Sequence, residues 1–151
     1  MWRAVDDRIA LAPGAEENEV AVWVASRVDE SLRERPDSHR DFSAIRAAVA
    51  MVASDRRESV TLRFDHGYLT IHDGMLGIPD LTLCGDFAAL VGLADIPLSR
   101  AGRLPLPPLN AARRSAWRTT ALELVSGELK VYGMFSHPRL LMRLLRLLSM
   151  G

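Results

Sequence analysis

The side chains that could support catalysis or hold a metal ion are few and lie far apart in the sequence. The chain has four histidines and a single cysteine, Cys84. His66 and His72 are six residues apart, and at about 3.3 Å per residue of extended strand this is too far for them to share a zinc ion. Cys84 lies in a predicted strand and would act as a nucleophile only if the fold placed a histidine beside it. The sequence therefore predicts no catalytic residue, no metal site and no cofactor.

A group of arginines in the second half of the chain could bind phosphate. Arg113, Arg114 and Arg118 have Trp117 as their neighbouring aromatic residue, whereas nucleic-acid-binding surfaces usually interleave basic residues with several aromatic side chains. The sequence also has no glycine-rich phosphate loop and no nucleophile elbow. We therefore expect no nucleic-acid partner.

Arginine and leucine separate onto opposite faces of a helix predicted over residues 138–148. At about 100° per residue, three arginines form one narrow stripe and six leucines fill the other face. Such a helix can cover an apolar interior while its guanidinium groups stay in water. It could belong to an ordinary packed core, cover a lipid ligand as a lid, or contact a membrane. The arginines are Arg139, Arg143 and Arg146, and the leucines are Leu140, Leu141, Leu144, Leu145, Leu147 and Leu148.

Charge is distributed unevenly, although the whole chain is formally neutral. Residues 1–95 contain 10 arginines and 17 acidic residues, whereas residues 96–151 contain 9 basic and 2 acidic residues. Either the two halves attract each other on folding, or the second half presents a basic surface to anionic lipid or phosphate. The single cysteine fits a reducing compartment, the N-terminus lacks the apolar core of a signal peptide, and no apolar run is long enough to span a bilayer. We therefore expect a cytoplasmic protein.

The length of the chain predicts one domain over residues 1–151. Residues 1–14 are expected to form a loose arm, and a helix is expected over residues 16–34. A second helix should begin near Ser38. Its inward residues, by helical spacing, are Phe42, Ile45, Val49 and Val52.

Alternating apolar residues predict a β-hairpin in the middle of the chain. Its strands cover residues 60–64 and 68–72, and Gly67 is available for the positive φ of the turn. A third strand is predicted over residues 80–84, and Asp86 should cap a short helix that follows it. A proline-rich loop, a helix and a strand are expected before the terminal helix, over residues 95–109, 110–126 and 127–133. This order predicts an α+β fold with two layers, in which helices cover one face of a twisted, mostly antiparallel sheet.

Three segments, in this order and spacing, resemble the sterol carrier protein 2 family, and the resemblance covers roughly residues 60–150. A strand ends in Asp-Gly, a second strand passes through Gly-Asp into a helix, and a third reads Ser-Gly-x-Leu-x-Val-x-Gly before a leucine-rich terminal helix. The segments are residues 67–74 (GYLTIHDG), 80–90 (DLTLCGDFAAL) and 126–133 (SGELKVYG).

The resemblance implies an apolar tunnel between sheet and helices that binds a lipid without catalysis. The lipid would be a sterol, a fatty acyl chain or, as for bacterial members that assist ubiquinone biosynthesis, an isoprenoid quinone precursor. The residues expected to line the tunnel are Phe87, Leu90, Val91, Trp117, Leu129, Leu141, Leu144 and Leu145.

The stripe of Arg139, Arg143 and Arg146 is expected to contact an anionic membrane surface, and a homodimer is a further expectation. The chain departs from the family at the long loop over residues 95–109 and at Met134-Phe135, both of which would border the tunnel. The alternative function is an interaction module with a filled core, for example an accessory subunit in isoprenoid quinone biosynthesis.

Overall fold

The computed structural model of the chain describes residues 3–92, 129–133 and 136–148. The predicted loop over residues 95–109 and helix over residues 110–126, which contains Trp117, lie outside the described residues. The described elements are β1 (Arg3–Asp6), β2 (Ile9–Leu11), the 3₁₀ turn η1 (Ala15–Glu17), α1 (Glu19–Glu34), α2 (Ser38–Ala44), β3 (Arg46–Ala53), β4 (Glu58–Asp65), β5 (Leu69–Asp73), β6 (Leu81–Gly85), α3 (Phe87–Gly92), β7 (Leu129–Tyr132) and α5 (Pro138–Leu148).

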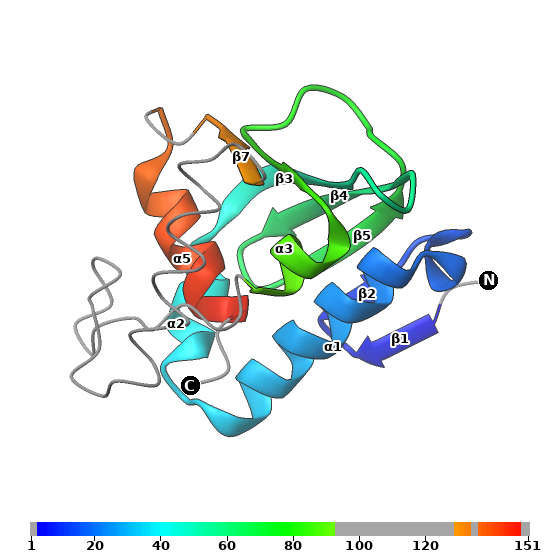
Figure 1. Ribbon diagram of the computed structural model, residues 1–151. Coiled ribbons are helices and arrows are strands. Elements are labelled where there is room, and N and C mark those ends of the chain that lie inside the picture. The colour runs from blue at the N-terminus through cyan, green and yellow to red at the C-terminus, as the bar shows by residue number, and fades with distance from the viewer. Residues whose placement is uncertain (1–2, 93–128, 134–135, 149–151) are drawn as a thin grey trace, which may run out of the picture.

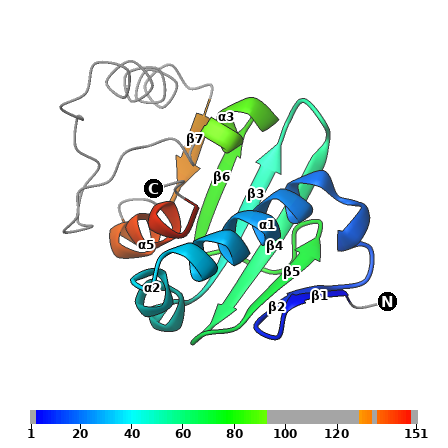
Figure 2. The same cartoon turned by 90° about the horizontal axis from the view of Figure 1, so that it is seen from below.

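The seven strands of the described residues form one mixed sheet in the order β1-β2-β5-β4-β3-β6-β7. The pairs β2–β5 and β3–β6 are parallel, and the other four neighbouring pairs are antiparallel. Helix α1 runs diagonally across one face of the sheet, and α2, α3 and α5 lie on that same face (Figures 1 and 2). The predicted α+β architecture of two layers, with a mostly antiparallel sheet, is therefore confirmed.

The prediction of a loose arm over residues 1–14 is wrong, because residues 3–11 form a hairpin that joins the sheet. β1 and β2 pair with each other, and β2 then pairs in parallel with β5, which places Ile9 beside Leu69. Ile9 is fully buried and Leu11 is nearly so. The apolar triplet Ile9–Leu11 is too short to show a periodicity of its own, so it becomes a strand through the hydrogen bonds that β5 offers it.

The second predicted helix is also partly wrong, because α2 ends at Ala44 and the residues after it form the central strand β3. The sequence of β3 is almost entirely Ala, Val and Met, and such an apolar run fits a buried strand as well as a helix. Pairing with β4 on one side and β6 on the other decides between them. Val49 is buried in the core as predicted, but Val52 lies on the opposite face of the sheet, because side chains alternate along a strand.

The hairpin predicted around Gly67 is confirmed. β4 and β5 are antiparallel, and His66 and Gly67 both have positive φ angles, of 43° and 93°. Two positive φ angles define the type I′ turn, whose twist matches that of the flanking strands. The other predicted elements within the described residues, α1, β6, α3, β7 and α5, are present close to their expected positions.

The side chain of Asn18 connects the start of α1 to the sheet. Its oxygen accepts hydrogen bonds from the backbone N–H groups of Val20 and Ala21, which caps the helix. Its amide nitrogen donates to the carbonyl of Ser59 on β4 at 3.0 Å and to the carboxylate of Asp73 on β5 at 2.8 Å. One buried residue therefore satisfies the free end of a helix and fixes where that helix lies on the sheet.

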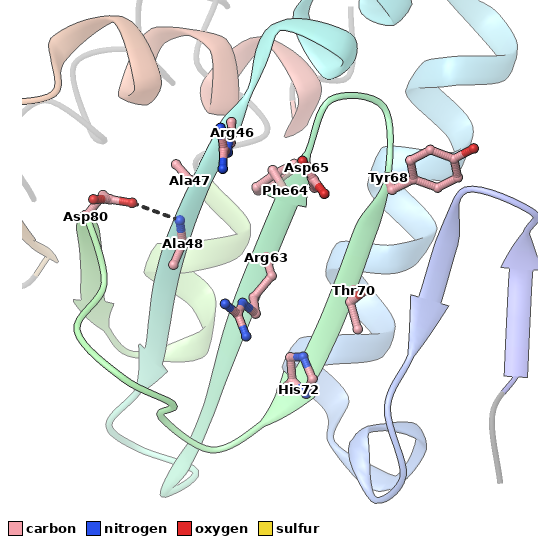
Figure 3. Close-up of a pocket in the computed structure, with 10 residues that line it drawn as sticks. All are labelled: Arg46, Ala47, Ala48, Arg63, Phe64, Asp65, Tyr68, Thr70, His72 and Asp80. Atoms are coloured by element: carbon pink, nitrogen blue, oxygen red, sulfur yellow. Dashed lines mark hydrogen bonds between the residues drawn. The ribbon is translucent and has the colours of Figure 1, made fainter.

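The connection from β5 to β6, residues 74–80, crosses β4 and β3 on the face opposite the helices, and we call it the strap (Figure 3). The hydroxyl of Thr61 on β4 donates to the carbonyl of Gly74 and accepts from the N–H of Leu76. At the other end, the N–H of Asp80 donates to the carbonyl of Ala48 on β3, and the N–H of Ala48 donates to the Asp80 carboxylate at 2.9 Å. These bonds hold the strap against the sheet at both ends.

Candidate functional site

Most of the residues predicted to bind a ligand lie on the helix-covered side of the sheet, in α3 and α5. Leu90, Leu144 and Leu145 are buried members of one continuous hydrophobic core. Phe87, Val91 and Leu141 are half-buried. Leu129 begins β7, but its side chain, like all of Trp117, lies outside the described part of the structure. The structure thus brings the α3 and α5 residues into one apolar interior, and a tunnel through that interior stays a prediction.

Phe87 is held in place by α1 and by the turn between β3 and β4. Its ring makes an edge-to-face contact with Trp23 of α1, with ring centroids 6.5 Å apart, and the guanidinium of Arg56 lies 4.1 Å from its centroid. The N-terminus of α3 is fixed as well, because the carboxylate of Asp86 accepts from the N–H of Ala89 and that of Asp55 accepts from the N–H of Phe87. These contacts fix the N-terminal end of α3 at the border of the apolar interior.

Polar side chains of α1 bind the C-terminal end of α5. The last carbonyls of a helix have no partner within the helix, and here α1 and the residue after it supply the donors. These donors are four residues apart, so they lie on one stripe beside the apolar stripe of α1. This contact was not predicted from the sequence, although the four-residue spacing of the polar residues was a signal for it. The donor–acceptor pairs are Arg27 with the carbonyl of Leu148, Ser31 with that of Leu147, and Arg35 with that of Arg146.

The three arginines of α5 differ in their surroundings. Arg146 lies 3.4 Å from the carboxylate of Asp41 on α2, and its side chain is 29% exposed. Arg143 is half-buried and Arg139 is exposed. Arg146 therefore connects α5 to α2, and membrane contact through this stripe stays a prediction that depends mainly on Arg139 and Arg143.

The contact between α2 and α5 should make stability depend on pH through Asp41. Burial raises the pKa of the Asp41 carboxyl above its ordinary value of 3.8, and the guanidinium groups of Arg146 and Arg143 oppose this shift without cancelling it. A carboxyl with a higher pKa in the folded state stabilises the fold fully at low pH. That contribution is lost as the pH rises through the raised pKa.

We therefore expect the wild type to lose stability relative to Asp41→Asn as the pH rises above 3.8. Urea midpoints measured at a series of pH values would show this as two curves that diverge. Asp37→Asn, at an exposed position just before α2, is the matched control and should follow the wild type. Parallel curves for Asp41→Asn and the wild type would contradict the prediction.

The face of the sheet opposite the helices contains a groove of about 720 Å³, which is within the usual range for small-molecule sites. Strands β3, β4 and β5 form its floor, and the strap with Asp80 borders it (Figure 3). The groove could not be predicted from the sequence, because that requires the register of three strands. The lining residues with charged or polar side chains are Arg46, Arg63, Asp65, Tyr68, Thr70, His72 and Asp80.

No protein-family model and no curated protein matches the sequence. Among solved structures, a UbiJ-SCP2 ubiquinone synthesis protein matches over 82% of this chain and 90% of its own, with 16% sequence identity and a TM-score of 0.50. The chain has an SCP2-like fold. A sterol carrier protein 2 structure matches over 85% of this chain and 95% of its own, with 14% identity and a TM-score of 0.47. The inverting sec-alkylsulfatase Pisa1 from Pseudomonas sp. matches over 75% of this chain and 14% of its own, with 21% identity and a TM-score of 0.48.

Within the described part of this SCP2-like fold, no three His, Cys, Asp or Glu side chains lie close enough to hold a metal ion. Cys84 lies on β6, where its neighbours on the adjacent strands are Val52 and Lys130. None of the described helices has the length and apolar character needed to cross a membrane.

Proposed function

We propose that this chain binds a lipid in the apolar interior between its sheet and helices α3 and α5, and that it does so without catalysing a reaction. The observation that carries the proposal is the placement of Leu90, Leu144 and Leu145 in one apolar interior of an SCP2-like fold. Burying a hydrocarbon chain gains about 0.8 kcal/mol per CH₂ group, so a sterol, fatty acyl or isoprenoid ligand would need few polar contacts. The similarity to a UbiJ-SCP2 ubiquinone synthesis protein favours an isoprenoid quinone precursor among these lipids.

The N-terminal half of α5 is the part of the helix that would move to admit the lipid. Its C-terminal half is buried and bonded to α1, whereas Leu140, Leu141 and Met142 are half-buried and Arg139 is exposed. Arg139 and Arg143 would hold this end near anionic headgroups, at about 1 kcal/mol for each basic residue. We place the protein in the cytoplasm, where such contact would be peripheral and reversible.

Displacement of a fluorescent fatty acid from the full chain tests the proposal. The wild type should bind the probe and release it to unlabelled competitors, and Leu141→Gln should weaken binding about tenfold, because burying an unpaired amide costs about 1–3 kcal/mol. Val22→Gln, at a 43% exposed position on α1, is the matched control and should bind like the wild type. Native mass spectrometry of gently purified protein should also show a co-purified lipid.

A folded protein that neither binds the probe nor carries a lipid would overturn the proposal. That result would favour the second candidate, an interaction module with a filled core. The strap supports this candidate, because it exposes three apolar side chains, Met75 at 50%, Leu76 at 46% and Ile78 at 95%. An apolar patch of this kind is typical of protein-binding surfaces. If the chain is such an interaction module, the native mass spectrum should show a stable homodimer or hetero-oligomer.

A further inference from the structure

We propose that the groove on the uncovered face of the sheet is a separate binding site, in which Arg63, Thr70 and His72 hold the phosphate group of a small soluble metabolite. The groove lies on the face opposite the proposed lipid site. Ala47 and Phe64 border both the groove and the apolar core, but none of the charged and polar residues of the groove belongs to the core cluster. The inference therefore stands whether or not the interior binds a lipid.

The strand register brings the three side chains together. Arg63 on β4 lies directly opposite Thr70 on β5 and Ala48 on β3, and side chains in such cross-strand positions have Cβ atoms about 4.5–5.5 Å apart. His72 follows Thr70 by two residues, on the same face of β5. The hydroxyl of Thr70 therefore lies on one side of Arg63, and the methyl group of Ala48 lies on the other. The imidazole of His72 lies diagonally across from Arg63, and Figure 3 shows this arrangement in the middle of the groove.

The centre of the groove has a positive charge that no described carboxylate neutralises. Within the described residues, Arg63 makes no ion pair and no side-chain hydrogen bond. Asp65 lies opposite Arg46 at one end of the groove, and Asp80 lies at the edge beside β3, where its carboxylate accepts from the N–H of Ala48. In the described part of the chain, Arg63 therefore presents an unpaired positive charge to an anion in the middle of the groove. Other arginines do pair with carboxylates, namely Arg27, Arg33, Arg56 and Arg146.

The pKa of His72 should depend on whether an anion is bound beside it. Burial and the charge of Arg63 lower the pKa of His72 below 6.5, so near neutral pH the ring is uncharged and can donate one hydrogen bond. The charged groups on the elements around it are Arg46, Arg63 and Asp65 on the sheet and Asp80 on the strap. A phosphate placed beside His72 would offset the charge of Arg63 and raise the pKa of the imidazole, so binding would take up a proton.

The donor set suits phosphate better than carboxylate. Arg63 presents a planar fork, and Thr70 and His72 add donors from the neighbouring strand, which gives three directions of approach to three terminal oxygens. A carboxylate has two oxygens, which the fork alone would satisfy. Hydrogen bonds hold the strap to the sheet beside the site, so the groove is formed before a ligand arrives. The volume of the groove also leaves room for parts of the ligand other than the phosphate group.

Titration of the histidine signals by NMR, with the full chain, tests the inference. At constant ionic strength, inorganic phosphate or glycerol phosphate should raise the pKa of His72 relative to chloride. Arg63→Gln should weaken phosphate binding about tenfold or more, since a charge-assisted hydrogen bond and the charge itself are lost. Thr70→Val, which keeps the β-branched shape, should weaken it about threefold. Arg40→Gln, on the exposed surface of α2, should bind like the wild type.

A His72 signal that titrates identically in phosphate and chloride would overturn the inference. So would equal binding of acetate, or equal weakening by Arg40→Gln and Arg63→Gln. A second experiment measures binding to vesicles that contain phosphatidic acid. If the protein binds these vesicles through Arg63 but does not bind soluble phosphate, the ligand of the site is a lipid headgroup instead. If Arg63→Gln disturbs the sheet, as circular dichroism would show, Thr70→Val decides the question alone.

Discussion

Replacing Leu144 by alanine should lower the free energy of unfolding by about 2–5 kcal/mol, the usual cost of such a truncation in a closed core. Leu144 is fully buried, in the half of α5 that packs against α1 and α2. The polar bonds from α1 to the C-terminal carbonyls of α5 keep the helix from shifting to fill the cavity. Urea denaturation of the two proteins measures the effect directly.

Leu140→Ala is the matched control for this experiment, because it makes the same change one turn earlier in the same helix. Leu140 is half-buried against the core, so its truncation should lower the free energy of unfolding clearly less.

Removing residues 138–151 should prevent folding altogether. A truncated chain that folds and merely loses its ligand would show instead that α5 is a separable lid. An equal loss of stability in Leu140→Ala and Leu144→Ala would contradict the anchoring of the C-terminal half of α5.

Replacing Gly133 by alanine should destabilise the protein by about 3 kcal/mol or more. Gly133 follows β7 with a φ angle of 89°, which costs a residue with a Cβ atom about 1–2 kcal/mol. A Cβ atom here would also overlap the backbone carbonyl of Asp80 in the strap. That carbonyl cannot easily move away, because Asp80 is bonded twice to Ala48. The substitution should therefore separate β7 from the strap.

Gly77→Ala separates the two causes of this effect. Gly77 also has a positive φ angle, of 67°, but a Cβ atom there would have no neighbour within 4 Å. Its replacement should cost only the backbone strain, about 1–2 kcal/mol. Thermal and urea unfolding of both variants would give the steric contribution by difference. If the two variants lose the same stability, the close approach of Gly133 to the strap has no energetic importance.

Local chemistry made some of the elements predictable from the sequence. The turn at Gly67 needed a residue that accepts a positive φ angle, and the cap at Asp86 needed a carboxylate beside the first turn of a helix. Both requirements concern neighbours in sequence, and both predictions are confirmed. The amphipathic pattern of α5 likewise predicted its bounds and its buried leucines.

The elements that the sequence analysis predicted wrongly depend on partners that are distant along the chain. The strap covers part of one face of β3 and the helices cover the other, so its residues are apolar on both faces. Such an apolar run fits a helix as well as a strand. Ile9–Leu11 becomes a strand only beside β5. The groove around Arg63 and His72 could not be predicted from the sequence either, since a shift of one residue between β4 and β5 would move Arg63 to the other face. The placement of Leu90 and Leu144 in one interior was predicted through the family resemblance.

The β1–β2 hairpin has a consequence for self-assembly. Without it, β5 would present five residues of unpaired backbone at the border of the sheet, and an exposed strand of this kind is a template for fibril-like growth between molecules. The hairpin pairs with Leu69–Ile71 of that backbone, and the outermost strand of the described residues on this side becomes β1, which is four residues long and has an irregular register between Ala4 and Asp6. Short and irregular strands pair poorly with a second molecule. Residues 3–11 therefore protect the protein against aggregation as well as completing its core.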